Sequence, residues 1–324
     1  MNPLPSHPIT TELPDRLSPA SDSPKSSLPC TRLANSRKPL PSSSNDRPLV
    51  SVITVSLNSA KYLEQTIRSV LDQTYDRIEY LVIDGASTDG TLDIIRRHES
   101  GIHTWISEPD QNMYDAINKG ILRCSGDIVA VLNSDDMYPA PDTIERMIEN
   151  TRRFPEWDGW YGDCIKIYPD RARYQKFFQI NHRRFLLAQR GTFIPHAGLF
   201  LRRRCLEYVG LYDTRYHFAA DYDFLLRCLR QFRFKYIPRP YLVFRVHPES
   251  ITASGRIRRE RIALLKEHGV MNHSPLSRRI LHACVWSRYI WHNLIWPRSA
   301  RPYRRLLSNA PAAHVPSPLG ETTP

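Results

Sequence analysis

The strongest constraint on the fold is a regular alternation of two kinds of segment between Pro48 and Asp136. Four runs crowded with apolar and β-branched residues predict strands, at 49–56, 78–83, 102–107 and 128–134. Between them, apolar residues recur every three or four positions, which predicts helices beginning near Leu63, Thr91 and Met113. This alternation favours an α/β domain with a mostly parallel sheet and helices on both faces.

Carboxylates stand where these predicted strands end. Asp84 and Asp89 follow the second strand, and the adjacent Asp135 and Asp136 close the fourth. In such a sheet, ligands bind outside the carboxyl ends of the strands. Mg2+ and Mn2+ prefer oxygen ligands, so the pair Asp135 and Asp136 predicts a site for a divalent cation. Acidic pairs also occur in plain surface turns, and the pair alone does not decide between the two.

Four segments fall in a characteristic order and spacing: Val50–Asn58, Asp84–Thr91, Asp110–Gly120 and Asn133–Asp136. Together they resemble the family 2 glycosyltransferases of the GT-A fold, a Rossmann-like α/β fold, over roughly residues 48–250. The resemblance implies transfer of a sugar from a nucleotide-sugar donor, foremost a UDP-sugar, to an acceptor hydroxyl. Two departures stand out. The usual Asp-Asp-Gly-Ser reads Asp84-Gly85-Ala86-Ser87, and Gln111-Asn112 replaces the Lys-Gly that many relatives carry after Asp110.

The resemblance assigns roles to the acids at the strand ends. Asp136, with Asp135 beside it, would hold a Mn2+ or Mg2+ ion that bridges the donor phosphates and offsets charge on the leaving group. Asp84 would accept a hydrogen bond from the base. The base and ribose would rest on the end of the first strand, at Val55, Ser56 and Asn58. Asp84 is alternatively part of a plain turn, and Asp89 is either a donor contact or a helix cap.

The helix predicted near Met113 places three polar residues on one face, Asp115, Asn118 and Lys119. By resemblance they lie beside the donor pocket. The alternative is a solvated face whose charges pair with one another.

Transfer to a hydroxyl also needs a base, and two acids open a predicted helix near residue 220. Asp221 aligns best with the catalytic aspartate of the family, and Asp223 is the second candidate. Relatives usually carry Glu-Asp at this point, whereas here Ala220 precedes Asp221. Both acids would alternatively only interact favourably with the helix dipole.

Two histidines complete the predicted site. His196 interrupts the apolar run 193–201 and, by resemblance, would lie near the sugar and phosphates; a buried core residue is the alternative. His247 would complete the ligand set of the cation or touch the diphosphate, and Arg245 would offset phosphate charge. The alternative for His247 and Arg245 is that they are polar loop residues that contact no ligand.

The chain ends differ from this catalytic domain, which we place at 48–254. Residues 1–47 are rich in Pro and Ser without periodicity and are predicted to be disordered, as is the tail 307–324. We expect no secretory signal in this segment, because Met1–Ser6 shows neither a basic start nor an uninterrupted apolar stretch. The six cysteines show no close pairing or metal-ligand spacing, which favours the cytoplasm and argues against a disulfide scaffold or a zinc site.

The formal net charge of +12 is concentrated in a basic segment, 255–306, predicted to be an amphipathic helical extension. Its part 278–305 mixes Arg with Trp and Leu and is too polar to span a membrane. It would lie on an anionic membrane surface at the inner face of the cell membrane, near a lipid-linked acceptor, or pack on the catalytic domain.

The resemblance therefore implies an inverting, metal-dependent glycosyltransferase, and family analogy suggests cell-surface polysaccharide or lipid-linked glycan assembly as its setting. A sugar nucleotidyltransferase is an alternative, but it would need a Gly-rich phosphate loop that Val55–Ala60 lacks. A catalytically inactive nucleotide-sugar-binding relative is another. Nucleic acid is not an expected partner, because no helix-turn-helix, zinc-finger or RNP-like pattern occurs.

Overall fold

The computed structural model describes residues 47–180, 194–247 and 257–268, together with 283, 287 and 290. All of them belong to one compact unit, Asn45–Pro324. The termini predicted to be disordered, apart from residue 47, and nearly all of segment 278–305 lie outside the described residues. Among the described residues, no helix is both long and apolar enough to cross a membrane.

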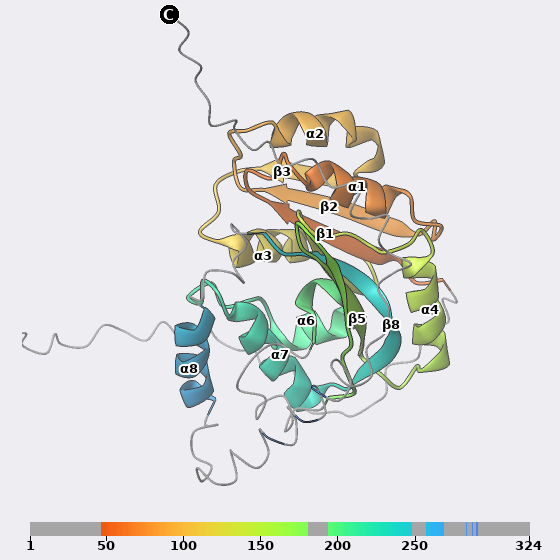
Figure 1. Cartoon of the computed structure of the whole chain (residues 1–324), viewed down its shortest axis with the longest axis vertical. Helices are drawn as coiled ribbons and strands as arrows, with labels where there is room; N and C mark the ends of the chain where they lie inside the picture. Colours follow the sequence, from red (N-terminus) through yellow and green to blue (C-terminus); the bar gives the residue numbers. More distant parts are fainter. Residues whose placement is uncertain are drawn as a thin grey trace, which may run out of the picture. The chain divides into compact units, whose positions relative to one another are not determined.

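The strands of the described chain form one eight-stranded sheet (Figure 1). They are β1 (Val50–Ser56), β2 (Ile78–Asp84), β3 (Thr104–Ser107), β4 (Ile128–Asn133), β5 (Gly159–Ile167), β6 (Ala172–Gln175), β7 (Leu199–Arg202) and β8 (Phe234–Arg245). Their order is β3-β2-β1-β4-β7-β5-β6, and β8 pairs with β5. The first four strands are those predicted from the sequence, although β3 begins two residues later than expected.

The register of the first four strands brings their carboxyl ends together. β1 runs parallel to β2 and β4, with Ser56 opposite Asp84 and Val55 opposite Asn133. β3 runs parallel to β2, with Ser107 also opposite Asp84. The polar residues that follow these strands therefore lie at one edge, as the alternation predicts.

The remaining strands correct the expectation of a mostly parallel sheet. β7 is antiparallel to both β4 and β5, β6 is antiparallel to β5, and β8 is parallel to β5. The sheet is mixed, with a parallel core. Apolar patterning marks a buried strand but does not reveal its direction, which the connections and packing decide.

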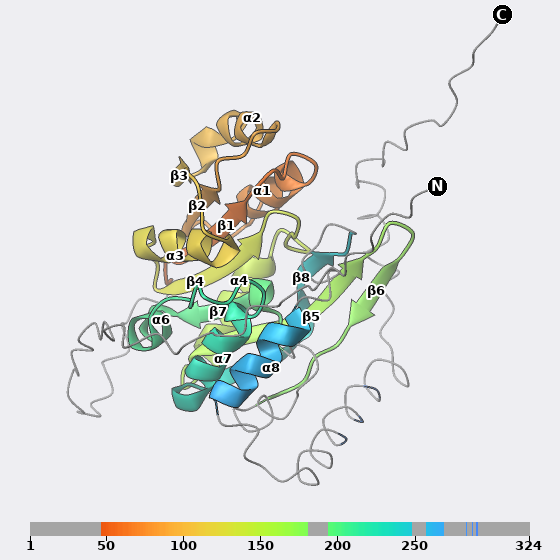
Figure 2. The ribbon, with the colours of Figure 1, turned by 90° about the vertical axis from the view of Figure 1, so that its left-hand side faces the viewer.

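The described helices are α1 (Leu63–Leu71), α2 (Thr91–Arg97), α3 (Met113–Arg123), α4 (Thr143–Arg153), α6 (Arg203–Val209), α7 (Ala220–Gln231) and α8 (Ile257–Glu267), with short 3-10 turns η1 (Glu99–Gly101) and η2 (His196–Gly198). Figure 2 shows α1 and α3 on opposite sides of β1 and β2. All seven residues of β1 are buried, as expected for a strand covered on both faces.

Close packing fixes the helices that carry the candidate site. Gly120 in α3 lies against Ile53 of β1, so closely that a Cβ at position 120 would be 2.4 Å from the Ile53 side chain. Phe224 and Leu225 of α7 are fully buried. The described cysteines Cys124, Cys164, Cys205 and Cys228 are buried and free, so none of them forms a disulfide.

Candidate active site

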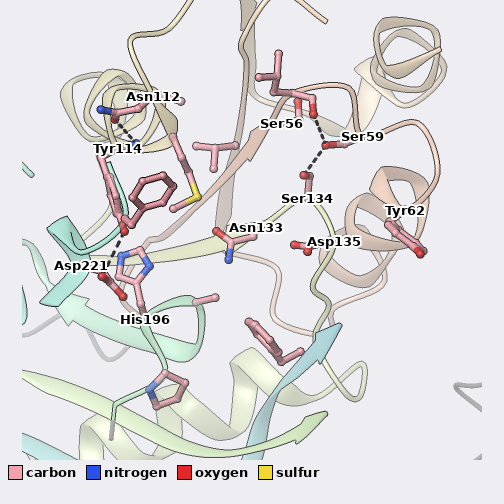
Figure 3. A pocket seen from close by; sticks show the side chains of 18 of the residues that line it. Ser56, Ser59, Tyr62, Asn112, Tyr114, Asn133, Ser134, Asp135, His196 and Asp221 are labelled. Atoms are coloured by element: carbon pink, nitrogen blue, oxygen red, sulfur yellow. Dashed lines mark hydrogen bonds between the residues drawn. The ribbon is translucent and has the colours of Figure 1, made fainter. Parts of the chain in front are cut away.

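A cavity of about 850 Å3 lies outside the carboxyl ends of the parallel strands. Its walls come from the loops after β1, β2, β3 and β4, from α3, α7 and η2, from β5, β6 and β8, and from one residue of α8. Figure 3 shows several of the lining side chains around the shared space. The predicted residues that line it are Val55, Ser56, Asn58, Asp135, His196, Asp221 and His247. This volume suits a ligand of the size of a cofactor or nucleotide.

Asp135 and His247 meet at one side of the cavity. The carboxylate oxygen Oδ2 of Asp135 lies 3.0 Å from Nε2 of His247, although the two residues are 112 positions apart. The loop that carries Asp135 is fixed by α1, because the Thr66 hydroxyl donates hydrogen bonds to the carbonyl oxygens of Ser134 (2.8 Å) and Asp136 (2.6 Å). The pair is thus held in place before any ligand binds.

Asp136 and Arg245 lie behind this pair rather than in the cavity. Asp136 is fully buried and accepts hydrogen bonds from the backbone N–H of Arg245 (3.1 Å) and from Nδ2 of Asn133 (3.2 Å). Burial, together with the nearby Asp135 carboxylate, raises the pKa of Asp136 well above its ordinary value. Arg245 donates to the Asp135 carbonyl (3.1 Å) and to Gln65 (2.7 Å). The predicted acidic pair is therefore divided, with one acid facing the cavity and one joining β8 to the loop.

The side chains at this corner fit a cation that also binds a phosphate. Asp135 and His247 supply an oxygen and a nitrogen donor, and Oδ1 of Asn133 is a buried oxygen to which no described residue donates. The described residues contain no cluster of three or more His, Cys, Asp and Glu side chains that could hold a metal by itself. Mg2+ is commonly bound by one or two carboxylates together with substrate phosphates and water, so a full protein cage is not required.

Asp221 enters the cavity from the first turn of α7 (Figure 3). Its Oδ1 accepts hydrogen bonds from the Tyr114 hydroxyl (3.3 Å) and from the backbone N–H of Tyr222 (2.8 Å). His196 lies close by, with Nε2 2.6 Å from the Tyr212 hydroxyl. Burial raises the pKa of Asp221 and lowers that of His196. A carboxylate with raised proton affinity in a cavity has the character of a general base.

Asp223 does not line the cavity. Its two carboxylate oxygens contact Nε of Arg227 (2.7 Å) and Nε2 of His268 just beyond α8 (2.9 Å). Its side chain is buried and joins α7 to α8. Because both oxygens are engaged away from the cavity, we do not retain Asp223 as a candidate base.

Asp84 is likewise engaged by its own chain. It is fully buried and accepts hydrogen bonds from the hydroxyls of Ser56 (3.0 Å), Ser87 (2.5 Å) and Ser107 (2.8 Å) and from the Ser87 N–H (2.9 Å). The carboxylate thereby ties the ends of β1, β2 and β3 together. It does not line the cavity, whereas its neighbour Gly85 does.

Asp89 lies directly before Gly90, the N-cap residue of α2. Its carboxylate accepts hydrogen bonds from the backbone N–H groups of Thr91 (2.9 Å) and Ala60 (3.1 Å). It does not line the cavity. Its contacts are thus with backbone groups around the start of α2 and not with the cavity, although the N-cap position itself is Gly90.

The polar face of α3 also makes contacts within the protein. None of its three members, Asp115, Asn118 and Lys119, lines the cavity. Asn118 exchanges two hydrogen bonds with the Tyr212 backbone (2.8 and 2.9 Å). Lys119 forms an ion pair with Asp110 (2.7 Å) and lies 3.8 Å from Asp115. Among these, Asp110 is the residue that reaches the cavity.

Among the lining residues that sequence reasoning missed are Asp110, Tyr114, Tyr222 and Arg261. Tyr114 was in a recognised motif, and its place after the helix-capping Asn112 could have marked it as a first-turn residue facing the strand ends. Arg261 had no such signal. It belongs to α8, within the segment predicted as a separate basic extension, and contacts the site only through the tertiary fold.

Comparisons with known proteins identify the family of the chain. Residues 51–209 match the family model described as glycosyl transferase family 2. An uncharacterized glycosyltransferase of Mycobacterium tuberculosis is 37% identical over 183 residues, which is 56% of this chain and 68% of that protein. The chain therefore belongs to glycosyl transferase family 2.

Two solved structures share the fold. TarS of S. aureus in complex with UDP-GlcNAc matches with a TM-score of 0.59 at 16% identity, over 80% of this chain and 79% of that one. Another TarS structure is matched over 43% of its own length. A mannosyltransferase of Pyrobaculum calidifontis in complex with GDP-Man and Mn2+ matches with a TM-score of 0.55 at 23% identity, over 81% and 79%. At these identities the likeness shows the GT-A-like fold alone.

The protein is thus a glycosyltransferase that uses a nucleotide sugar. Family membership leaves no support for the alternative of a sugar nucleotidyltransferase. The side chains in the cavity bear on the other alternative, a catalytically inactive relative.

Proposed function

We propose that the protein transfers a sugar from a UDP-sugar to an acceptor hydroxyl with inversion at the anomeric carbon. The observation that carries the proposal is the separation of two kinds of group across one cavity. Asp135 and His247 lie at the end of β4 and β8, and Asp221 with its raised pKa lies at the start of α7. The first pair suits the diphosphate side of a donor, and the buried carboxylate suits proton removal from an acceptor.

The reaction is a single displacement. The acceptor oxygen forms a bond to the anomeric carbon as the bond from that carbon to the diphosphate oxygen breaks. Asp221 takes the proton of the acceptor hydroxyl, and the electron pair of the broken bond leaves with UDP. One displacement inverts the anomeric configuration, and a single base is sufficient for it. Tyr114, hydrogen-bonded to Asp221, orients the carboxylate toward the cavity.

Asp135 and His247 are the residues that would hold a Mn2+ or Mg2+ ion. When bound, such a cation offsets the negative charge of the donor diphosphate. The Mn2+ in the mannosyltransferase structure supports this assignment. Asp136 would not touch the cation. Its carboxylate accepts a hydrogen bond from the backbone N–H of Arg245 and would thereby fix the end of β8 close to His247.

For the acceptor we propose a glycan or lipid-linked glycan of cell-surface polysaccharide assembly. The support is family analogy and the basic, Trp-containing sequence 278–305, which would bring the enzyme to an anionic membrane surface. That segment lies outside the described residues.

Substitution of the base tests the proposal. Asp221→Asn keeps the shape and the hydrogen bond from Tyr114 but cannot take a proton. We expect nucleotide-sugar transfer to fall by about 10²–10⁴-fold while UDP binding stays within about twofold of wild type. The measurements are UDP release from a panel of UDP-sugars with soluble and lipid-linked acceptors, and calorimetric titration with UDP. Transfer by Asp221→Asn at the wild-type rate would show that Asp221 is not the base.

A further inference from the structure

The cavity contains a carboxylate oxygen that the functions assigned so far do not use. Oδ2 of Asp110 lies so close to Gly85 that a Cβ at position 85 would be 2.9 Å from it. Both residues line the cavity. No described residue donates a hydrogen bond to this oxygen, although Asp110 has only 10% of its side chain exposed. The side chain is thus largely withdrawn from water, and Oδ2 is left as an acceptor for a donor that a ligand can supply.

The other oxygen of Asp110 is held firmly. Its Oδ1 forms an ion pair with Nζ of Lys119 at 2.7 Å. The same ammonium group contacts Glu108 (3.0 Å) and donates to the carbonyl of Pro109 (2.8 Å), so one cation fixes the loop 108–110. The carboxylate is therefore anchored through Oδ1, which leaves Oδ2 beside Gly85 as the free acceptor.

The strand order identifies which part of a donor would meet this oxygen. Across the sheet the order is β2, β1, β4, β7. Gly85 follows β2, Asp135 follows β4, and His196 lies just before β7, next to Asp221. A nucleotide sugar has its base, ribose, diphosphate and sugar in a line. With the diphosphate beside Asp135 and the sugar beside Asp221, the base falls at the β2 end, where Asp110 stands.

We propose that Asp110, rather than Asp84, reads the nucleobase, and that Oδ2 of Asp110 accepts the N3–H of uracil. This inference rests on the proposed function. Asp84 cannot serve because its oxygens already accept hydrogen bonds from three serines and it does not line the cavity. One free oxygen matches the single N–H that uracil presents between its carbonyl groups. Guanine presents two neighbouring donors, and cytosine presents an acceptor at N3, which a carboxylate disfavours.

Gly85 makes room for this arrangement. The φ angle of Gly85 is not in the left-handed region, so its backbone conformation is open to other residues. A side chain at position 85 would instead be limited by its close approach to the Asp110 carboxylate. The other atoms near an added Cβ are a Leu57 methyl at 3.4 Å and the Ser56 carbonyl at 3.6 Å, which are ordinary contacts. The Asp110 carboxylate thus fills the space in which a carboxylate carried by residue 85 would stand.

The test is calorimetric titration of UDP, GDP, CDP and ADP against wild type and Asp110→Asn. Wild type should bind UDP at least about tenfold more tightly than CDP, because uracil can donate a hydrogen bond to the charged Asp110 and cytosine N3 cannot. Asp110→Asn should lose about tenfold in UDP affinity and bring the UDP-to-CDP ratio to within about threefold. Asp93→Asn, on the exposed surface of α2 and outside the cavity, is the control and should behave as wild type.

Relocating the carboxylate gives an independent readout. The double variant Gly85→Asp with Asp110→Ala should recover much of the preference for UDP over CDP that Asp110→Ala loses. An unchanged ratio in Asp110→Asn would overturn the inference. Equal loss of all four nucleotides would also overturn it, because a structural role of the loop would suffice, and a wild-type preference for GDP would overturn the uracil assignment. Binding of no nucleotide by wild type would instead refute the proposed function itself.

Discussion

At the scale of single residues, the candidate site is defined by which carboxylate oxygens the protein leaves available. Three acids use their oxygens on their own chain, Asp84, Asp136 and Asp223. Three others present a carboxylate to the cavity, Asp110, Asp135 and Asp221. The sequence identified five of these six, but it could not divide them. Neighbours such as Asp135 and Asp136 have the same chemistry, and only the direction of each side chain, set by the turn after β4, separates their roles.

Asp221 should reduce stability while it serves the reaction. Burial raises its pKa above the ordinary value of 3.8, so the folded state disfavours its ionised form. This penalty is absent below the unfolded pKa and is complete once the pH exceeds the raised folded pKa. We expect Asp221→Asn to raise the melting temperature at pH 7 by about 2–4 °C, the shift that roughly 1 kcal/mol causes in a domain of this size.

Thermal unfolding followed by circular dichroism from pH 3.5 to 8 checks this. The difference between variant and wild type should vanish near pH 3.5, where both side chains are neutral. A variant that is less stable than wild type at pH 7 would indicate that ionised Asp221 is stabilised by its surroundings, contrary to the geometry described above.

Asp135 should govern the effect of a cation on nucleotide binding. Asp135→Asn keeps the size of the side chain but removes its charge beside His247. We expect Mn2+ to strengthen UDP binding to wild type, EDTA to abolish that gain, and the variant to show little gain. Asp93→Asn, on the exposed surface of α2, is the control. Equal gains in Asp135→Asn and wild type would exclude Asp135 as a ligand.

At the scale of elements, α8 links a segment that looked peripheral in the sequence to the active site. The Glu260 carboxylate accepts hydrogen bonds from three consecutive backbone N–H groups just before α7, at residues His217 (3.0 Å), Phe218 (2.6 Å) and Ala219 (3.1 Å). α7 has no side-chain cap of its own. The position of Asp221 in its first turn therefore depends on a helix some forty residues later in the chain.

Removal of this carboxylate should weaken both stability and turnover. Glu260→Ala is expected to cost about 1–2 kcal/mol, the usual effect of losing a helix cap, and to slow transfer more than it weakens UDP binding. Urea unfolding and steady-state kinetics measure the two effects. Lys266→Ala, at an exposed position of the same helix, should be neutral. If both variants unfold at the same urea concentration, α8 does not hold the start of α7.

Sequence patterning predicted β1 to β4 and the helices between them well, because strands and helices of a parallel core carry strong and different periodicities. It overstated the parallel character of the whole sheet. β5, β7 and β8 are buried strands whose directions depend on long connections, and α8 is separated from its contacts on α7 by a long stretch of chain. The strand directions and the contact between α8 and α7 are set by tertiary packing, and the periodicity of a local segment gives no information about them.

At the scale of the whole molecule, one cavity collects residues from four strand ends, from helices α3, α7 and α8 and from a distant histidine, in the order that we propose for a bound nucleotide sugar. The order could be expected in part from the sequence, since acids follow successive strands of one sheet. The placement of Asp110, Tyr114 and Arg261 could not, because nothing in their local sequence shows that they face the same space. Family membership gives the reaction class, and the geometry of the cavity supports the roles that we propose for its side chains.

The most direct test of this account is a crystal structure of the protein with a UDP-sugar and Mn2+. We predict uracil between the ends of β1 and β2 against Asp110, the diphosphate and cation beside Asp135 and His247, and the sugar near His196 with its anomeric carbon facing Asp221. A donor bound outside the cavity, or bound in the reverse direction with its sugar at Gly85, would contradict the account.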